Sequence, residues 1–335
     1  MSRKLIKAFI LTFSIVLVTK APPYAIAATP SGTNIPGAAP AHPDQQQYTI
    51  KTSALPAPLT ALGTPTPADQ TALHQAIAAY QAAKAPIQTM PLELFAVQHP
   101  NSPWTASLWL NIGLIHEQAA DYPAAIRAFN LALAAAGPET QNNDGPATRA
   151  LAELLTLQTA YGHADQIKAL LANPRAKTHN ALLAAPIKSA THALWVMQHE
   201  PQKANRSGTA SLGELIDVLN PHSQKLAGIK QAQTSPQGES LAALQKLAAE
   251  AGTPLQVVRI TATSPIPFPS VMHWTIGHYT TIIGMKNGLY RVYDPAFEQE
   301  KLISREVLPR DKQDESAASI RVRIGGCRAV AGRRA

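Results

Sequence analysis

The 335-residue sequence predicts an α+β fold, in which an N-terminal α-helical domain precedes a smaller domain of helices and antiparallel strands. Residues 67–199 are dominated by Ala, Leu, Gln and Lys, and their apolar positions recur at spacings of three and four, as in helices. From about residue 200, helical stretches give way to β-branched runs, and Lys286-Asn287-Gly288 separates two of these runs as a hairpin turn would.

Residues 1–27 have the three parts of a secretory signal peptide. Arg3, Lys4 and Lys7 precede a short apolar run at 8–18, and Ala25-Ile26-Ala27 offers an A-x-A cleavage site. We expect a bacterial protein exported to the periplasm or beyond. The alternative is an uncleaved anchor. The apolar run is short for a spanning helix and no other stretch is long enough, so we expect no stable membrane insertion after signal cleavage.

The Pro-, Ala-, Gly-, Thr- and Gln-rich residues 28–66 predict a linker that buries no core. The single cysteine, Cys327, excludes an internal disulfide framework. We interpret it as incidental, and the alternative is a disulfide to another molecule. The formal net charge is +8, but no basic patch with interleaved aromatic residues is present, so we expect no nucleic-acid partner.

The helical domain, residues 67–199, contains seven stretches with helical periodicity that are separated by short Pro, Gly or Asn breaks. This arrangement is typical of stacked helical hairpins. The predicted helices are 71–84, 91–99, 105–119, 122–136, 148–161, 164–172 and 182–198.

The pair 105–136 resembles a tetratricopeptide repeat. Its small residues would let two helices cross closely, while its aromatic residues fill the groove between repeats. The resemblance implies a peptide-binding solenoid, and the alternative is a helical layer packed on a neighbouring domain. The matching positions are Trp109, Ile112, Gly113, His116, Tyr122, Ala125, Phe129 and Ala132, with Pro138 one place off.

Beyond residue 200 the patterns are shorter and mixed. We expect helices at 211–219 and 240–252, a polar loop at 220–238, a connector at 265–269, and strands at 255–263, 270–274, 278–285 and 289–295. The tail, residues 309–335, is Arg-, Ala- and Gly-rich, and we expect disorder there or one edge strand at SIRVRI, unless the end is altered.

His278 and Asp294 stand at the outer ends of the two strands that flank the predicted turn. If the hairpin closes at Asn287-Gly288, they lie near each other, and the Asp can orient the imidazole of a catalytic His. A buried structural His–Asp pair would show the same pattern.

The segment PFPSVMHWTIGHYTTIIGMKNGLYRVYDPAF, residues 267–297, resembles the C-terminal half of the peptidase C39-like domain, which has a papain-like fold. That family includes proteases that trim double-glycine leaders from exported peptides. The resemblance implies that residues 200–308 form such a domain, with His278 as the catalytic His and Asp294 as its orienting Asp.

The family nucleophile is a Cys that is followed by Gly and opens a helix. In NRSGTASLGELIDVL, Gly208 and Leu212 fit this pattern, but Ser207 stands at the Cys position. The family also places an oxyanion-holding Gln about six residues earlier, where this chain has Pro201 and then Gln202. With the preceding helical region, the resemblance extends over most of 70–300, as in C39-like proteins associated with Rhs-type secreted proteins.

The change from Cys to Ser alters the chemistry of the site. A Cys thiol, with a pKa of ~8.5, becomes a thiolate beside an imidazolium and a helix N-terminus, whereas a Ser hydroxyl must lose its proton during attack. Ser207 is therefore an inert residue of a peptide-binding pseudoenzyme, an active nucleophile, or a misaligned position. It also suits the role of N-cap of the following helix.

We thus expect an exported, catalytically impaired C39-like homologue that binds an extended peptide or a secreted protein partner. One alternative is an active peptidase or amide hydrolase that uses Ser207, His278 and Asp294. Another is a tetratricopeptide-type scaffold. We expect no cofactor and no metal, since the 11 His residues do not cluster with Cys or carboxylates at ligand spacing.

Overall fold

The computed structural model describes residues 48–83, 87–137, 145–232, 234–235, 238–260, 265–308 and 318–322. The predicted signal peptide, residues 28–47 of the predicted linker, Pro138 and Cys327 lie outside these residues. In the part of the chain that is described, no helix is both long enough and apolar enough to cross a bilayer.

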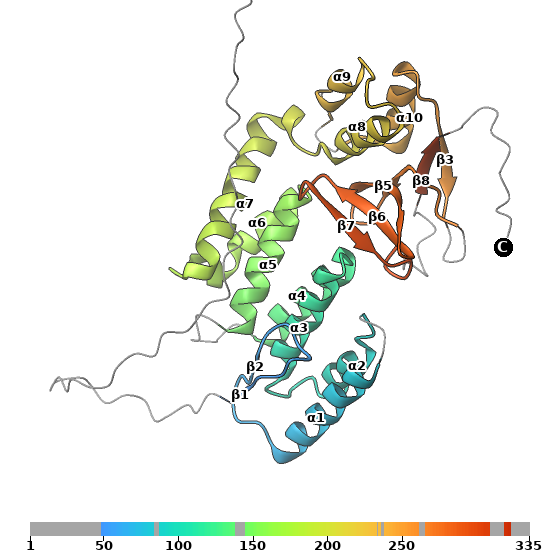
Figure 1. Cartoon of the computed structure of the whole chain (residues 1–335). Coiled ribbons are helices and arrows are strands. Elements are labelled where there is room, and N and C mark those ends of the chain that lie inside the picture. Colours follow the sequence, from blue (N-terminus) through green and yellow to red (C-terminus); the bar gives the residue numbers. More distant parts are fainter. Residues whose placement is uncertain are drawn as a thin grey trace, which may run out of the picture. The chain divides into compact units, whose positions relative to one another are not determined.

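The N-terminal half is helical, as the periodicity predicts (Figure 1). The first helix begins at a capping box, in which the Thr66 hydroxyl accepts a hydrogen bond from the Asp69 N–H and the Asp69 carboxylate accepts one from the Thr66 N–H. The helices are α1 (Pro67–Ala82), α2 (Met90–Gln98), α3 (Thr105–Gln118), α4 (Tyr122–Ala135), α5 (Pro146–Ala160), α6 (Ala164–Ala172) and α7 (Ala181–His199).

Helices α3 and α4 cross closely where the sequence places Gly113 opposite Phe129. The Phe129 ring is fully buried, and a Cβ atom at Gly113 would collide with it. The small residue Gly113 thus allows the close crossing, as the repeat-like spacing predicts. The tetratricopeptide interpretation of the whole region stays a prediction.

The second half of the expected linker is folded. Strands β1 (Thr49–Ile50) and β2 (Leu59–Thr60) pair, and Leu55 and Leu59 are buried. The Asn111 side chain of α3 accepts a hydrogen bond of 2.8 Å from the Ala57 N–H. For residues 48–66 the linker prediction is therefore wrong. A few apolar side chains are enough to form a small core here, because α3 provides a hydrogen-bond partner for the backbone between them.

The C-terminal half contains α8 (Ser207–Leu219), α9 (Leu226–Lys230) and α10 (Leu241–Glu250) beside a six-stranded antiparallel sheet. The short helix α9 lies in the stretch expected as a loop. The strands, in the order in which they pair, are β3 (Leu255–Arg259), β8 (Ala318–Val322), β4 (Ser270–His273), β5 (Tyr279–Lys286), β6 (Leu289–Asp294) and β7 (Gln299–Ile303).

The β5–β6 hairpin closes at the predicted turn. Lys286 pairs with Leu289, and Asn287 and Gly288 between them have φ values of 52° and 78°. Two successive positive φ values are those of a type I′ turn, which matches the twist of the flanking strands. This turn fixes the register that places the two outer ends of the hairpin together.

Strand β8 differs from the expectation of an edge strand in a disordered tail. It pairs with β3 on one side and β4 on the other, so it lies inside the sheet. The strand pattern at SIRVRI was visible in the sequence, but its two neighbours lie far away along the chain and left no local signal. Strand β7, at the opposite edge, was not predicted at all.

The hydrophobic core continues from the helices into the sheet. Phe129 of α4 and Leu154 of α5 belong to the same buried cluster as Ile282 of β5 and Val292 of β6. The core therefore runs across the domain boundary expected near residue 199.

Replacing Gly113 with Ala should lower the free energy of unfolding by about 1–3 kcal/mol, because the buried Phe129 ring must move to admit the methyl group. This cost exceeds the roughly 1 kcal/mol by which Ala favours a helix over Gly. Gly228→Ala is the control, since a Cβ atom there meets nothing within 4 Å. Equal urea midpoints for the two variants would contradict the prediction.

Ending the chain after Leu308 should leave β3 without any paired strand and expose one edge of β4, which would keep only β5, and should make the protein aggregate. Ending it after Val322 removes no described strand and should preserve solubility. Size-exclusion chromatography of the two truncated proteins compares them directly. A monodisperse protein ending at Leu308 would show that β8 is dispensable.

Candidate functional site

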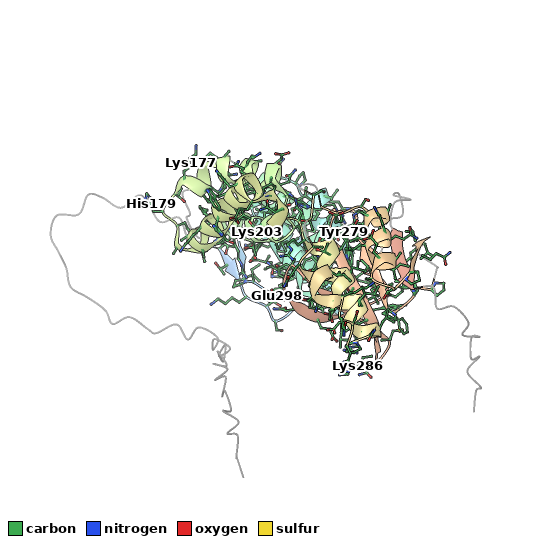
Figure 2. The ribbon with its side chains drawn as sticks, turned by 90° about the horizontal axis from the view of Figure 1, so that it is seen from above. Lys177, His179, Lys203, Tyr279, Lys286 and Glu298 are labelled. Atoms are coloured by element: carbon green, nitrogen blue, oxygen red, sulfur yellow. The ribbon has the colours of Figure 1, made fainter. Side chains whose placement is uncertain are left out.

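A short turn between β4 and β5 presents His278. The Trp274 N–H donates to the His278 carbonyl over 2.8 Å, and Gly277 takes a φ of 75°, which favours Gly. The Trp274 indole N–H also donates to the Thr280 hydroxyl over 2.9 Å. Tyr279 begins β5 just after His278, far from Lys286 at the other end of that strand (Figure 2).

The imidazole of His278 and the carboxylate of Asp294 form a buried pair. Nε2 lies 2.8 Å from Oδ1, and the residues are 2% and 4% exposed. The same Oδ1 accepts a hydrogen bond of 2.9 Å from the Ala296 N–H. The structure thus brings these two predicted residues together, and with Nε2 engaged, Nδ1 is the ring nitrogen left for a reacting group.

The end of α5 covers this pair. The Tyr161 ring packs on the His278 ring with 4.6 Å between centroids. The Tyr161 hydroxyl and Asp294 Oδ2 are both buried without a hydrogen-bond partner. Burial first, and then the negative charge of Asp294, raise the pKa of Tyr161 well above its usual value. Tyr161 is therefore a neutral phenol at all physiological pH values.

A second contact from the same turn holds the loop before His278. His163 Nε2 lies 2.7 Å from the Ile276 carbonyl oxygen, across 113 residues of sequence. Burial, and to a smaller extent electrostatic repulsion from the neighbouring His278, lower the pKa of His163. Sequence patterns did not indicate Tyr161 or His163, because both lie in a helical region far along the chain from the hairpin.

Ser207 is the first residue of α8 and is half-buried. The position before it, Arg206, is the N-cap, and no side chain caps the helix. The expectation that Ser207 itself serves as N-cap is therefore wrong. A Cβ atom at Gly208 would lie 3.3–3.4 Å from Leu244 and Tyr279, so Gly lets the start of α8 approach the sheet.

Ser207 and His278 line one cavity of ≈ 360 Å³. The rest of its wall comes from the end of α5, from α7, from the residues on either side of Ser207, and from Pro295 and Ala296. The structure describes both Ser207 and His278 and shows no hydrogen bond between them. Catalytic hydrogen bonds are often long or poorly aligned without substrate, so the missing bond is compatible with both an active and an inactive Ser207.

Gln202 is exposed in a 3₁₀ turn, Pro201–Lys203, and is not among the residues that line the cavity. The structure thus does not bring the predicted oxyanion candidate to Ser207 and His278. Asn205 lines the cavity instead, with a positive φ of 53° and its side chain packed on Gly162. None of the three residues of this turn lines the cavity, so the position at the family spacing, Pro201, does not reach it either.

Within the described ranges, no three His, Cys, Asp or Glu side chains gather as they would around a metal ion. His273, at the end of β4, stacks on Tyr279 with 4.4 Å between ring centroids. Burial first, and then electrostatic repulsion from His278, lower the pKa of His273.

Three comparisons with known proteins bear on this site. Residues 196–309 match the sequence model of the Peptidase C39 family, and this segment includes Ser207, His278 and Asp294. The matched segment contains the helices and strands of a mixed α+β unit, in agreement with the predicted class of that part of the chain.

Among solved structures, one chain resembles this protein at 20% sequence identity and a TM-score of 0.30. Its title is "Crystal structure of a double glycine motif protease from AMS/PCAT transporter in complex with the leader peptide". The alignment covers 36% of this chain and 84% of that chain. No curated protein matches the sequence.

A charged cluster joins β7 to the helices beside the site. The Lys301 ammonium donates a hydrogen bond of 2.6 Å to the Tyr122 hydroxyl and lies 5.0 Å from the centre of its ring. Burial raises the pKa of Glu117 from 4.5 to about 7, and the negative charge of Glu153 adds to the effect, while Lys301 opposes it. Glu117 is therefore partly protonated at neutral pH.

Because the pKa of Glu117 is higher in the folded protein than in the unfolded chain, its ionisation destabilises the fold as pH rises from 4.5 to about 7. Glu117→Gln should raise the free energy of unfolding by about 1–2 kcal/mol at pH 8, after allowance for solvent screening, and by almost nothing at pH 4. Glu250→Gln, at an exposed position, is the control. Denaturant titrations at both pH values test this, and an equal gain at pH 4 would contradict it.

Proposed function

We propose that the C39-matched region binds an extended peptide, or an exposed segment of a secreted protein, without cleaving it. The observation that carries this proposal is that a Ser hydroxyl, not a thiol, shares the cavity with His278. A Ser there cannot form the ionised nucleophile that an imidazolium stabilises in a Cys site.

The cavity supports binding because it is partly open and lined by both apolar and hydrogen-bonding groups, as ligand sites usually are. The buried His278–Asp294 pair would then fix the shape of the wall and not activate a nucleophile. The N-terminal sequence pattern further supports a place of action outside the bacterial cytoplasm, as a soluble protein after signal cleavage.

A second candidate is an amide hydrolase that uses Ser207 as nucleophile, His278 as base and Asp294 as orienting group. The short, buried hydrogen bond between His278 and Asp294 favours it, since this is how a general base is held. The absence of Gln202 from the cavity disfavours it, because the developing oxyanion would lack that donor.

Ser207→Cys should install a reactive thiol, and iodoacetamide should label it faster than it labels a free cysteine. Adding His278→Ala should slow the labelling by roughly tenfold or more, because the thiolate loses its imidazolium partner. Both variants need Cys327→Ser, since Cys327 would otherwise react as well. Mass spectrometry at pH 6–7 locates and times the modification.

The native protein, incubated with a peptide library, should bind peptides and leave them intact. Cleavage that His278→Ala abolishes would show instead that Ser207 is an active nucleophile. If the thiol at position 207 shows no dependence on His278, the alignment of Ser207 with the family nucleophile is wrong.

A further inference from the structure

Part of the cavity wall lies outside the segment that matches the family. Ala160 and Gly162 at the end of α5 and Ala193 on α7 line the cavity, and all three precede residue 196. We propose that this helical wall selects the side chain that the site admits, and that it admits an uncharged, apolar side chain of the bound peptide. This inference rests on the proposed function, because it takes the cavity as the peptide site.

The charges around the cavity favour an uncharged occupant. No Asp or Glu is among the described residues that line it, so a Lys or Arg side chain would lose its hydration without gaining a partner. Arg206 is the one Lys or Arg side chain of the described wall, and its guanidinium donates to the Lys230 carbonyl. The Arg206 side chain is exposed, so an acidic side chain paired with it would gain only the small energy of a solvent-screened ion pair.

The apolar part of the wall is incompletely covered. Val196 and Met197, from the last turns of α7, line the cavity and remain partly exposed. An apolar side chain that enters the cavity would cover them, at roughly 25 cal/mol for each Å² of apolar surface removed from water. The bound peptide would then contact both the helical region before residue 196 and the family-matched region, residues 196–309.

Two wall positions differ in what they can accept. A Cβ atom at Gly162 would collide with the Asn205 side chain, and the φ of Gly162 is 71°, so this position requires Gly. Ala193 lies mid-helix and is partly exposed, so a larger residue fits the helix and projects into the cavity. Ala185, exposed on the same helix and not part of the wall, is its matched control.

The test uses the full chain with Ser207→Cys and Cys327→Ser, and four alkylating reagents: iodoacetamide and the iodoacetyl derivatives of leucinamide, glutamic acid amide and lysinamide. In each case the thiolate displaces iodide and forms a C–S bond, so no other reactant is needed. We expect the leucinamide reagent to react about tenfold faster than the lysinamide reagent, a difference of ~1.4 kcal/mol in the barrier.

Ala193→Leu in this background should slow the leucinamide reagent about tenfold more than it slows iodoacetamide, because the larger reagent needs the space that Leu fills. Ala185→Leu should change neither rate. Circular dichroism of both variants checks that α7 remains folded.

The outcomes separate this inference from the proposed function. If iodoacetamide labels position 207 in a manner that depends on His278, but the three larger reagents react equally, the proposed function stands and the selective wall is wrong. The selective wall is also wrong if Ala193→Leu and Ala185→Leu change the labelling rates alike. It is wrong as well if the glutamic acid reagent is fastest, because that result would assign selection to Arg206. If iodoacetamide labelling does not depend on His278, both are overturned.

Discussion

The hydrogen bond between His278 and Asp294 is buried because residues from distant parts of the chain enclose it. The type I′ turn at Asn287-Gly288 sets the register, and the core shared by α4, α5 and the sheet excludes water from the pair. Removing either partner would leave a buried polar group without its hydrogen bond, which is more costly than losing the bond itself. The helices are thus a structural requirement of the site.

This enclosure leaves two polar atoms without partners, the Tyr161 hydroxyl and Asp294 Oδ2. Each such atom carries a desolvation cost of about 1–3 kcal/mol. Sites that bind or react often retain groups of this kind, since the arrangement that suits a ligand is not the most stable one. The unsatisfied atoms lie where Tyr161 of the helical region meets the pair on the sheet.

Local patterns predicted the helices, the β5–β6 turn and the meeting of His278 with Asp294, because each depends on residues close in sequence. The family resemblance added Ser207, which the structure places on the same cavity as His278. What the sequence did not reveal depends on long-range contacts: the position of β8 between β3 and β4, the packing of residues 48–61 on α3, and Tyr161 against His278. The prediction for Gln202 relied on the family spacing alone, whereas the 3₁₀ turn Pro201–Lys203 contributes no residue to the cavity.

The interior position of β8 determines when the fold can be completed. Ribosomes release a chain from its N-terminus, so the helices and five strands of the main sheet emerge before residues 318–322 do. Until then β3 has no neighbour in the sheet and cannot be held there by backbone hydrogen bonds. The sheet therefore closes late in synthesis, and during this interval the nascent protein presents open strand edges to chaperones or to other chains.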